Sequence, residues 1–134
     1  MSTWVEHLAD PRPITQIFGD LLPGSRDLVV HDLLASREGP SLTIRVDLRE
    51  FPADPPKKWA SAGYNRVQAK ITAVGVRQLR VDGLSPSMTG DLSVQKIGTG
   101  LRLDLVGDAF SVNLLADALI VSALSAYHDT ETVV

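Results

Sequence analysis

The sequence contains no cysteine, and only 5% of its residues are aromatic. Without thiols, the chain can form no disulfide framework, thiolate metal site, iron–sulfur cluster or cysteine nucleophile. So few aromatic side chains provide no stacking platform of the kind that single-strand nucleic-acid binders use. The net charge of −3 also argues against phosphate binding, which needs clustered lysine and arginine. We therefore expect no nucleic-acid partner.

The chain also lacks a long apolar run. The closest candidate, Ala118–Leu124, is far shorter than the roughly 18 residues that a membrane span needs. The first residues contain no basic segment followed by an apolar one, so we expect no signal peptide. Together with the absence of cysteine, which fits a reducing compartment, these features predict a cytoplasmic protein without a membrane partner. The 134 residues fit one domain, residues 1–134.

Catalytic and metal-binding motifs are missing as well. The three histidines, His7, His31 and His128, have no spacing typical of a metal pair. His31 precedes Asp32, but neighbours in a strand point to opposite faces, which argues against a catalytic dyad. The segment Gly98–Gly100 lacks the third glycine and the following helix of a dinucleotide site. We therefore expect no catalytic residues, no metal, no cofactor and no enzyme activity.

Alternation of apolar and polar residues is the strongest structural signal. Leu42, Ile44 and Val46 alternate with polar or charged residues, which is typical of a strand with one buried face. Short turn clusters between such segments predict antiparallel connections. The expected fold class is mainly β (α+β), an antiparallel meander sheet, curved or sandwich-like, of about seven strands with a short N-terminal helical region. The expected strands include Leu28–Ser36, Leu42–Leu48, Val67–Val74, Gln78–Val81 and two hairpins between Leu92 and Leu114.

The hairpins allow predictions of register. The turn cluster Arg37–Pro40 is expected to join the first two strands as an antiparallel pair. Gly107–Asp108 suits a two-residue type II′ turn. A four-residue loop, Ile97–Gly100, would keep Leu92 and Val94 on the apolar face of the hairpin that follows. The type II′ turn would pair Leu105 with Phe110, Leu103 with Val112 and Leu101 with Leu114.

The N-terminal region is expected to be helical. Ile14, Ile17, Phe18 and Leu21 follow helical spacing and predict one apolar stripe that packs on the sheet. We interpret Trp4 as an anchor for this packing rather than as a partner contact.

The segment Leu115–Tyr127 fits either a helix or a strand. The β-branched pair Ile120–Val121 favours a strand, which we expect to close the sheet near the first strand.

The segment from Glu50 to Arg66 is expected to form a long loop stiffened by three prolines. Loops of this length in compact domains are often functional. An exposed Trp59 flanked by lysines would be a plausible anchor for a protein partner. Alternatively, Trp59 folds back to plug an open end of the sheet. The candidate partner-binding residues at and beside this loop are Asp47, Glu50, Asp54, Lys57, Lys58, Trp59 and Tyr64.

Several motifs together resemble one protein family. The R-E-G-P turn at Arg37–Pro40, the strand Leu42–Leu48 and the P-P-K-K-W segment at Pro55–Trp59 carry most of the likeness. Phe51-Pro52, Val74–Val76, Leu79–Gly83 and Ala126-Tyr127 extend it. On these residues the chain is similar to the immunity protein 50 family of bacterial polymorphic-toxin systems. The resemblance implies a small cytoplasmic protein that binds and neutralises a cognate toxin, and it implies no catalytic residues.

The chemistry of the toxin would determine the surface that meets it. A nuclease toxin has a basic active site, so an acidic face is expected opposite it. The candidates for such a face are Asp47, Glu50, Asp82 and Asp91.

Two other functions stay open. The chain could be a β-barrel or sandwich that binds a small molecule, which an interior packed by Leu42, Ile44, Val46, Leu103 and Leu105 would exclude. It could also be a homo-oligomeric structural protein, or a homodimer, joined through sheet edges.

Overall fold

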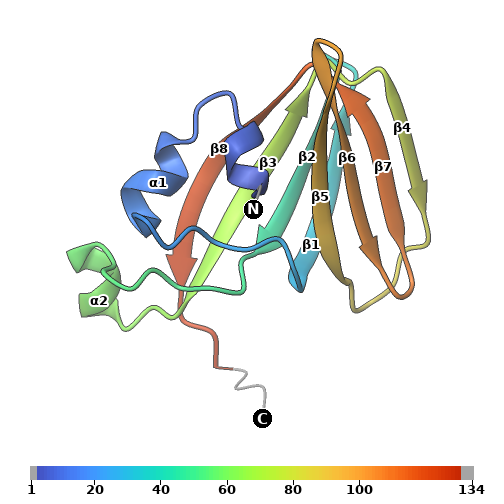
Figure 1. The fold of residues 1–134 in the computed structure, drawn as a ribbon. Coiled ribbons are helices and arrows are strands. Elements are labelled where there is room, and N and C mark those ends of the chain that lie inside the picture. The colour runs from blue at the N-terminus through green and yellow to red at the C-terminus, as the bar shows by residue number, and fades with distance from the viewer. Residues whose placement is uncertain (1–2, 131–134) are drawn as a thin grey trace.

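The computed structural model describes residues 3–130. All neighbouring strands of its single sheet are antiparallel, in the order β4-β7-β6-β5-β1-β2-β3-β8 (Figure 1). The helical elements are η1 (Trp4–His7), α1 (Arg12–Phe18) and α2 (Lys57–Ala62). The strands are β1 (Leu28–Ser36), β2 (Ser41–Asp47), β3 (Arg66–Val74), β4 (Gln78–Asp82), β5 (Thr89–Ile97), β6 (Gly100–Gly107), β7 (Ser111–Ala116) and β8 (Ala118–Tyr127).

The predicted mainly-β fold with a short N-terminal helical region is confirmed. The described residues form eight strands where about seven were expected. The segment Leu115–Tyr127, which was expected to be a strand, completes β7 and forms β8. The prediction that this last strand closes the sheet near the first one is wrong, since β8 pairs with β3 and β1 pairs with β5. None of the described helices has the length and apolar character needed to cross a membrane.

The sheet folds on itself, so that β8-β3-β2-β1 forms one half and β5-β6-β7-β4 the other. At one corner, β1 and β5 pair only through Leu28–Gly90 and Val29–Thr89. At the other corner, β3 leads into β4 and β7 leads into β8. The backbone stays hydrogen-bonded through this second corner, where the Asp117 amide donates to the Val74 carbonyl at 2.9 Å. Side chains from both halves therefore share one core.

The interior between the halves is tightly filled. The five residues whose packing would exclude an interior ligand site are each at most 2% exposed. They are Leu42, Ile44, Val46, Leu103 and Leu105. Burying one such side chain contributes roughly 1.5–3 kcal/mol to folding. This packing argues against a small-molecule site in the middle of the folded sheet.

The register of the β6–β7 hairpin differs from the prediction by two residues. Leu105 lies opposite Val112 rather than Phe110, because the turn is longer than two residues. The Gly107 amide donates to the Phe110 carbonyl at 3.0 Å, which closes the turn. A shift of two leaves every side chain on its face, so the apolar pattern could not reveal the error. The predicted partners of Leu103 and Leu101 are wrong by the same shift.

The other two predicted hairpins form, and the predicted register of the β5–β6 hairpin is confirmed. Its loop is shorter than the four residues predicted, because Ile97 and Gly100 pair with each other and leave Gly98 and Thr99 as the turn. In the β5–β6 hairpin, Leu92 lies opposite Leu105 and Val94 opposite Leu103, all on the core side. The turn Arg37–Pro40 joins β1 and β2 as expected.

The N-terminal segment covers one side of the folded sheet, with η1 against β5 and α1 against β8. Trp4 is buried, and its indole N–H donates to the Gly24 carbonyl at 3.2 Å, which confirms its interpretation as an anchor. Helix α1 ends at Phe18, because Gly19 adopts a positive φ of 63°. Leu21 therefore falls outside the helix and is 71% exposed, so its predicted place in the apolar stripe is wrong.

Gly75 offers a test of the corner between β3 and β4. It has a φ of +67°, and a Cβ atom there would lie 2.3 Å from a carboxylate oxygen of Asp117. Gly63 has a similar φ of +72° but no atom within 4 Å of such a Cβ. We expect Gly63→Ala to cost about 1–2 kcal/mol from backbone strain alone and Gly75→Ala to cost more. Urea unfolding measures both, and equal losses would show that the corner tolerates a side chain.

Candidate functional site

The segment from Glu50 to Arg66 was predicted to be a long loop. The structure shows that it contains helix α2. Pro56 precedes the helix in an extended conformation, where a proline does no harm to helical hydrogen bonds. Gly63 ends the helix in the left-handed conformation. The prolines therefore define where the helix begins instead of preventing it.

Trp59 anchors α2 to the body of the protein. Its ring lies 6.1 Å from the ring of Phe51, centroid to centroid, at an angle of 45°. Both rings are half-buried and pack against the core. Of the two alternatives for Trp59, the structure thus shows the one in which the side chain folds back. Lys57 and Lys58 remain exposed.

The end of the segment is tied to the C-terminal part of the chain. The side chain of Asn65 donates to the Asp129 carbonyl at 3.1 Å and accepts from the Asp129 amide at 2.7 Å. His128 Nδ1 lies 3.1 Å from the Gly63 carbonyl. Tyr64 lies between these contacts and is 36% exposed. These bonds hold the segment just after the C-terminal end of α2.

A polar cluster lies beside this segment, around Asp47 at the end of β2. Asp47 is the only buried charged residue among those described, with 4% of its surface exposed. Its Oδ2 lies 2.8 Å from His31 Nε2 and also accepts the hydroxyl of Tyr127. Its Oδ1 accepts from the Gln68 side chain at 3.3 Å. A buried carboxylate needs such partners, because its desolvation would otherwise be very costly.

An irregularity in β1 brings His31 to this cluster. The pairing of β1 with β2 shifts between Val30 and Asp32, which leaves His31 as the extra residue of a bulge. His31 and Asp32 then bond to different groups, as expected from the argument against a dyad. Asp32 accepts from the Arg45 Nε at 2.8 Å, and Arg45 also donates to the Gln68 side chain at 3.3 Å.

Tyr127 serves the cluster as a hydrogen-bond donor. Burial raises the pKa of its hydroxyl well above the usual value, and the hydrogen bond to Asp47 raises it further. The hydroxyl therefore stays protonated at neutral pH and donates to the carboxylate. The neighbouring Asp129 carboxylate acts in the same direction.

The chemistry of this cluster is that of a satisfied carboxylate. Among the described residues, no serine, threonine or lysine side chain hydrogen-bonds to His31, so no nucleophile accompanies the histidine–aspartate pair. The described residues also include no group of three or more histidine, aspartate or glutamate side chains arranged to hold a metal ion. The arrangement can hold β1, β2, β3 and β8 together on their outer face.

The acids predicted to face a basic target do not gather on one surface. Asp47 is buried, and Glu50 accepts from the Gly24 amide at 3.0 Å. Asp82 and Asp91 belong to the other half of the sheet, where Asp82 bonds to Arg80 at 2.8 Å. Asp91 accepts from the Asp27 amide at 3.0 Å.

Of the predicted partner-binding residues, Glu50, Asp54, Lys57, Lys58 and Tyr64 are exposed, while Trp59 is half-buried. The polar partners of Asp47 were missed. Alternation places Asp47 and Gln68 on outer faces, but the bulge at His31 and the pairing of β8 with β3 carry no signal in the sequence.

The family model described as Immunity protein 50 matches residues 10–127 of the chain. The match spans every strand of the sheet and the polar cluster. No curated protein and no solved structure matches the chain.

Removal of the Asp47 carboxylate tests its structural role. We expect Asp47→Ala to lower the free energy of unfolding by about 2–3 kcal/mol, because His31, Gln68 and Tyr127 lose their common partner. The control is Asp82→Ala, which removes an exposed carboxylate from a surface ion pair and should change stability little. Chemical denaturation measures both, and similar losses would contradict the role of Asp47.

Tyr127 predicts a dependence of stability on alkaline pH. Its pKa is raised in the folded state, so the unfolded chain loses this proton first and stability falls as pH rises above about 10. Tyr127→Phe should be less stable at neutral pH by about 1 kcal/mol and should lose less stability on going to high pH. Tyr64→Phe, at an exposed tyrosine, should keep the wild-type profile. Chemical denaturation at a series of pH values measures the free energy of unfolding of the three proteins. Parallel profiles of this free energy against pH for all three would contradict the role of Tyr127.

Proposed function

The chain belongs to the immunity protein 50 family, and we propose that it is a non-enzymatic protein that binds a cognate bacterial toxin domain and neutralises it by occlusion. The observation that carries this proposal is the family match over residues 10–127. We further propose that it acts in the cytoplasm of the cell that makes the toxin, because a cell protects itself there from its own toxin.

The chemistry of the described residues supports a binding role. The one buried carboxylate is occupied by three donors and carries no adjacent nucleophile. The interior is filled by apolar side chains. An occluding protein needs neither a catalytic group nor a ligand cavity. It needs a rigid surface, because immobilising flexible groups on binding costs free energy.

The segment around α2 can contribute such a surface. The contact of Trp59 with Phe51 fixes one side of the helix, and the bonds of Asn65 to Asp129 fix the end of the segment. Lys57 and Lys58 then project from a helix that is already ordered. Asp54 and Tyr64 flank them and can bond to a partner.

The experiment that tests the function begins with capture of the partner. The tagged chain is expressed in the bacterium that encodes it, and the proteins that bind in stoichiometric amount are identified by mass spectrometry. We expect a protein with the architecture of a secreted toxin. Its terminal domain should stop growth when expressed alone and permit growth when co-expressed with this chain. Growth arrest that persists on co-expression would contradict the proposal.

The contribution of α2 can be tested with the same toxin domain. We expect Trp59→Ala to weaken binding about tenfold, which is roughly 1.4 kcal/mol, because the helix loses its anchor. Trp59→Phe, which keeps a ring against Phe51, should bind more tightly than Trp59→Ala. Titration calorimetry measures the affinities, and circular dichroism verifies the fold. Unchanged affinity of a folded Trp59→Ala variant would show that this segment does not contribute to the interface.

A further inference from the structure

The hydrophobic core is open on one side of the folded sheet, and β1 forms the first wall of this opening. Leu33 lies opposite Ile44 in the ladder, and Ala35 lies opposite Leu42. Directly paired residues share a face of the sheet, so Leu33 and Ala35 point to the core side, as their buried partners do. Leu33 is nevertheless only half-buried, and Ala35 is exposed. Nothing among the described residues covers this end of β1.

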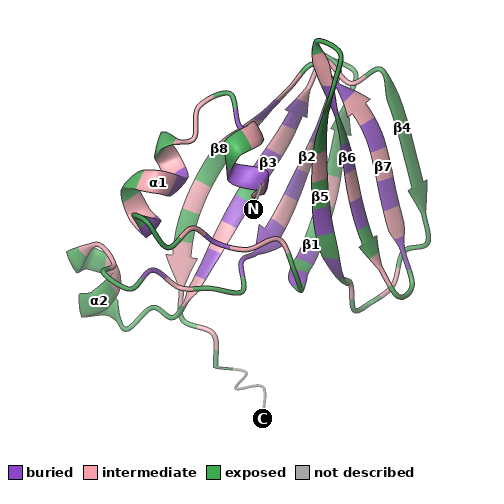
Figure 2. Ribbon diagram, in the orientation of Figure 1, coloured by how far each residue is buried: buried purple, intermediate pink, exposed green. Residues whose placement is uncertain are grey.

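Strand β4 forms the second wall. Leu79 lies opposite Leu114, and Val81 lies opposite Val112. Both partners are buried, so Leu79 and Val81 also face the core side, yet they are 40% and 39% exposed. In Figure 2, β4 is exposed along its whole length, whereas the inner strands alternate between buried and other residues.

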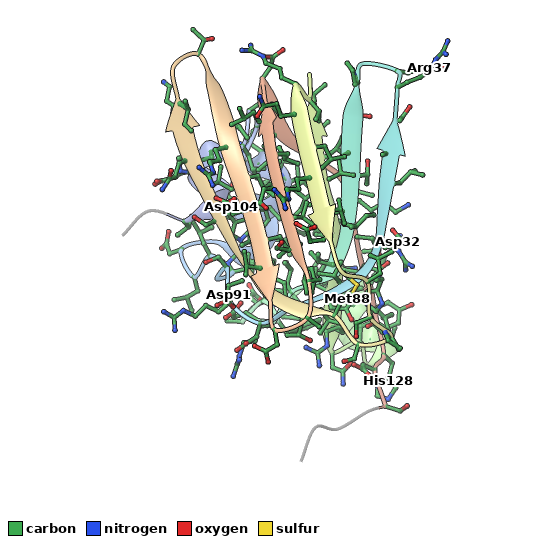
Figure 3. All side chains as sticks on the ribbon, turned by 90° about the vertical axis from the view of Figure 1, so that its right-hand side faces the viewer. Asp32, Arg37, Met88, Asp91, Asp104 and His128 are labelled. Atoms are coloured by element: carbon green, nitrogen blue, oxygen red, sulfur yellow. The ribbon has the colours of Figure 1, made fainter. Side chains whose placement is uncertain are left out.

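A groove of about 480 Å³ lies between these two walls. The loop after β4 contributes Leu84, which is 76% exposed, and Met88. Figure 3 faces the β4 side of the molecule, and its labels Asp32 and Met88 mark two residues of the groove lining. The lining is mostly apolar. Its polar members are His31, Asp32 and Ser85, and the side chains of His31 and Asp32 are bonded to Asp47 and Arg45.

The opposite side of the folded sheet shows what is missing here. Between β5 and β8 the chain supplies its own cover, since η1 packs on β5 and α1 packs on β8 (Figure 1). The Ala9 amide even donates to the Leu119 carbonyl of edge strand β8 at 2.9 Å. Between β1 and β4 no described segment plays this part.

The edge of β4 also determines the kind of group that fits. Within residues 3–130, β4 is the last strand of the sheet and pairs only with β7, so the backbone groups on its other edge have no strand partner there. An unpaired edge can accept another extended chain, which adds main-chain hydrogen bonds and places alternate side chains on one face. An added strand beside β4 would cover the uncovered core side of β1.

We propose that this groove receives an extended segment of the toxin, which adds to β4 as an antiparallel strand with alternate apolar side chains in the groove. The proposal rests on the proposed function. A segment of about five residues would match β4, which runs from Gln78 to Asp82. On the outer face, Arg80 and Asp82 favour a segment with an acidic residue opposite the arginine and a basic residue opposite the aspartate. The groove lies away from α2, so variants separate the two surfaces.

The experiment compares Val81→Lys with Val106→Lys. Val81 lines the groove, whereas Val106 lies on the outer side of β6 and is exposed to a similar extent, 49% against 39%. A phage-displayed library of random 12-residue peptides is selected on the full-length wild-type chain. The toxin domain captured as described above is the second ligand. Affinities for both ligands are measured with the three proteins, and amide hydrogen exchange is followed in β4.

We expect enriched peptides with alternating apolar residues. They and the toxin domain should bind at least tenfold more weakly to Val81→Lys than to Val106→Lys, and both should slow amide exchange in β4. Enriched peptides that bind Val81→Lys as tightly as wild type, or that leave β4 exchange unchanged, would overturn the proposal. So would the absence of any enriched peptide.

Two further results distinguish this proposal from its alternatives. If Val81→Lys neutralises the toxin with unchanged affinity, the groove proposal fails while the proposed function stands. The peptide selection needs no toxin, so it tests the groove even where the toxin experiment fails. Light scattering tests a second copy as the occupant. A wild-type dimer that Val81→Lys converts to monomer would overturn the proposal in favour of self-association, and a wild-type monomer supports it.

Discussion

The structure depends on one constraint, which is that an eight-stranded sheet with one apolar face must fold on itself to bury that face. The fold is possible because the chain bends at two corners. One is the brief pairing of β1 with β5, and the other is the turn at Gly75, where the approach of Asp117 leaves no space for a side chain. The two open sides of the folded sheet are covered to different extents. The N-terminal segment covers the side between β5 and β8, whereas the side between β1 and β4 keeps core-facing residues at the surface.

The outer face of the sheet has a second centre of organisation, at Asp47. A carboxylate with 4% exposure is stable only while its donors remain in place, so it couples strands that are distant in the sequence. His31 comes from the bulge in β1, Gln68 from β3 and Tyr127 from the end of β8. The same end of β8 leads into the contacts that hold the α2 segment. The buried charge thus helps to fix the end of β8, which precedes the residues that bond to the α2 segment.

Much of the fold could be predicted from local pattern, because alternation determines the face of each residue. Leu42, Ile44 and Val46 are buried as expected, and β5 and β6 pair as predicted. The register of β6 with β7 could not be obtained this way, because a shift of two residues leaves all faces unchanged. The candidate site could be predicted less well from the sequence. Asp47 was predicted as an exposed acid, but its burial follows from a bulge and from the β3–β8 pairing, both of which depend on contacts between distant segments. The helix in the proline-rich segment was missed because prolines before a first helical turn resemble prolines in a loop.

The central claim, that this member of the immunity protein 50 family neutralises a toxin by covering it, is tested most directly by titration of the purified toxin domain with the purified chain. We expect toxin activity to fall in proportion to added chain and to disappear at equimolar amounts, without change to either polypeptide. A toxin domain that remains fully active when saturated with the chain would contradict this claim.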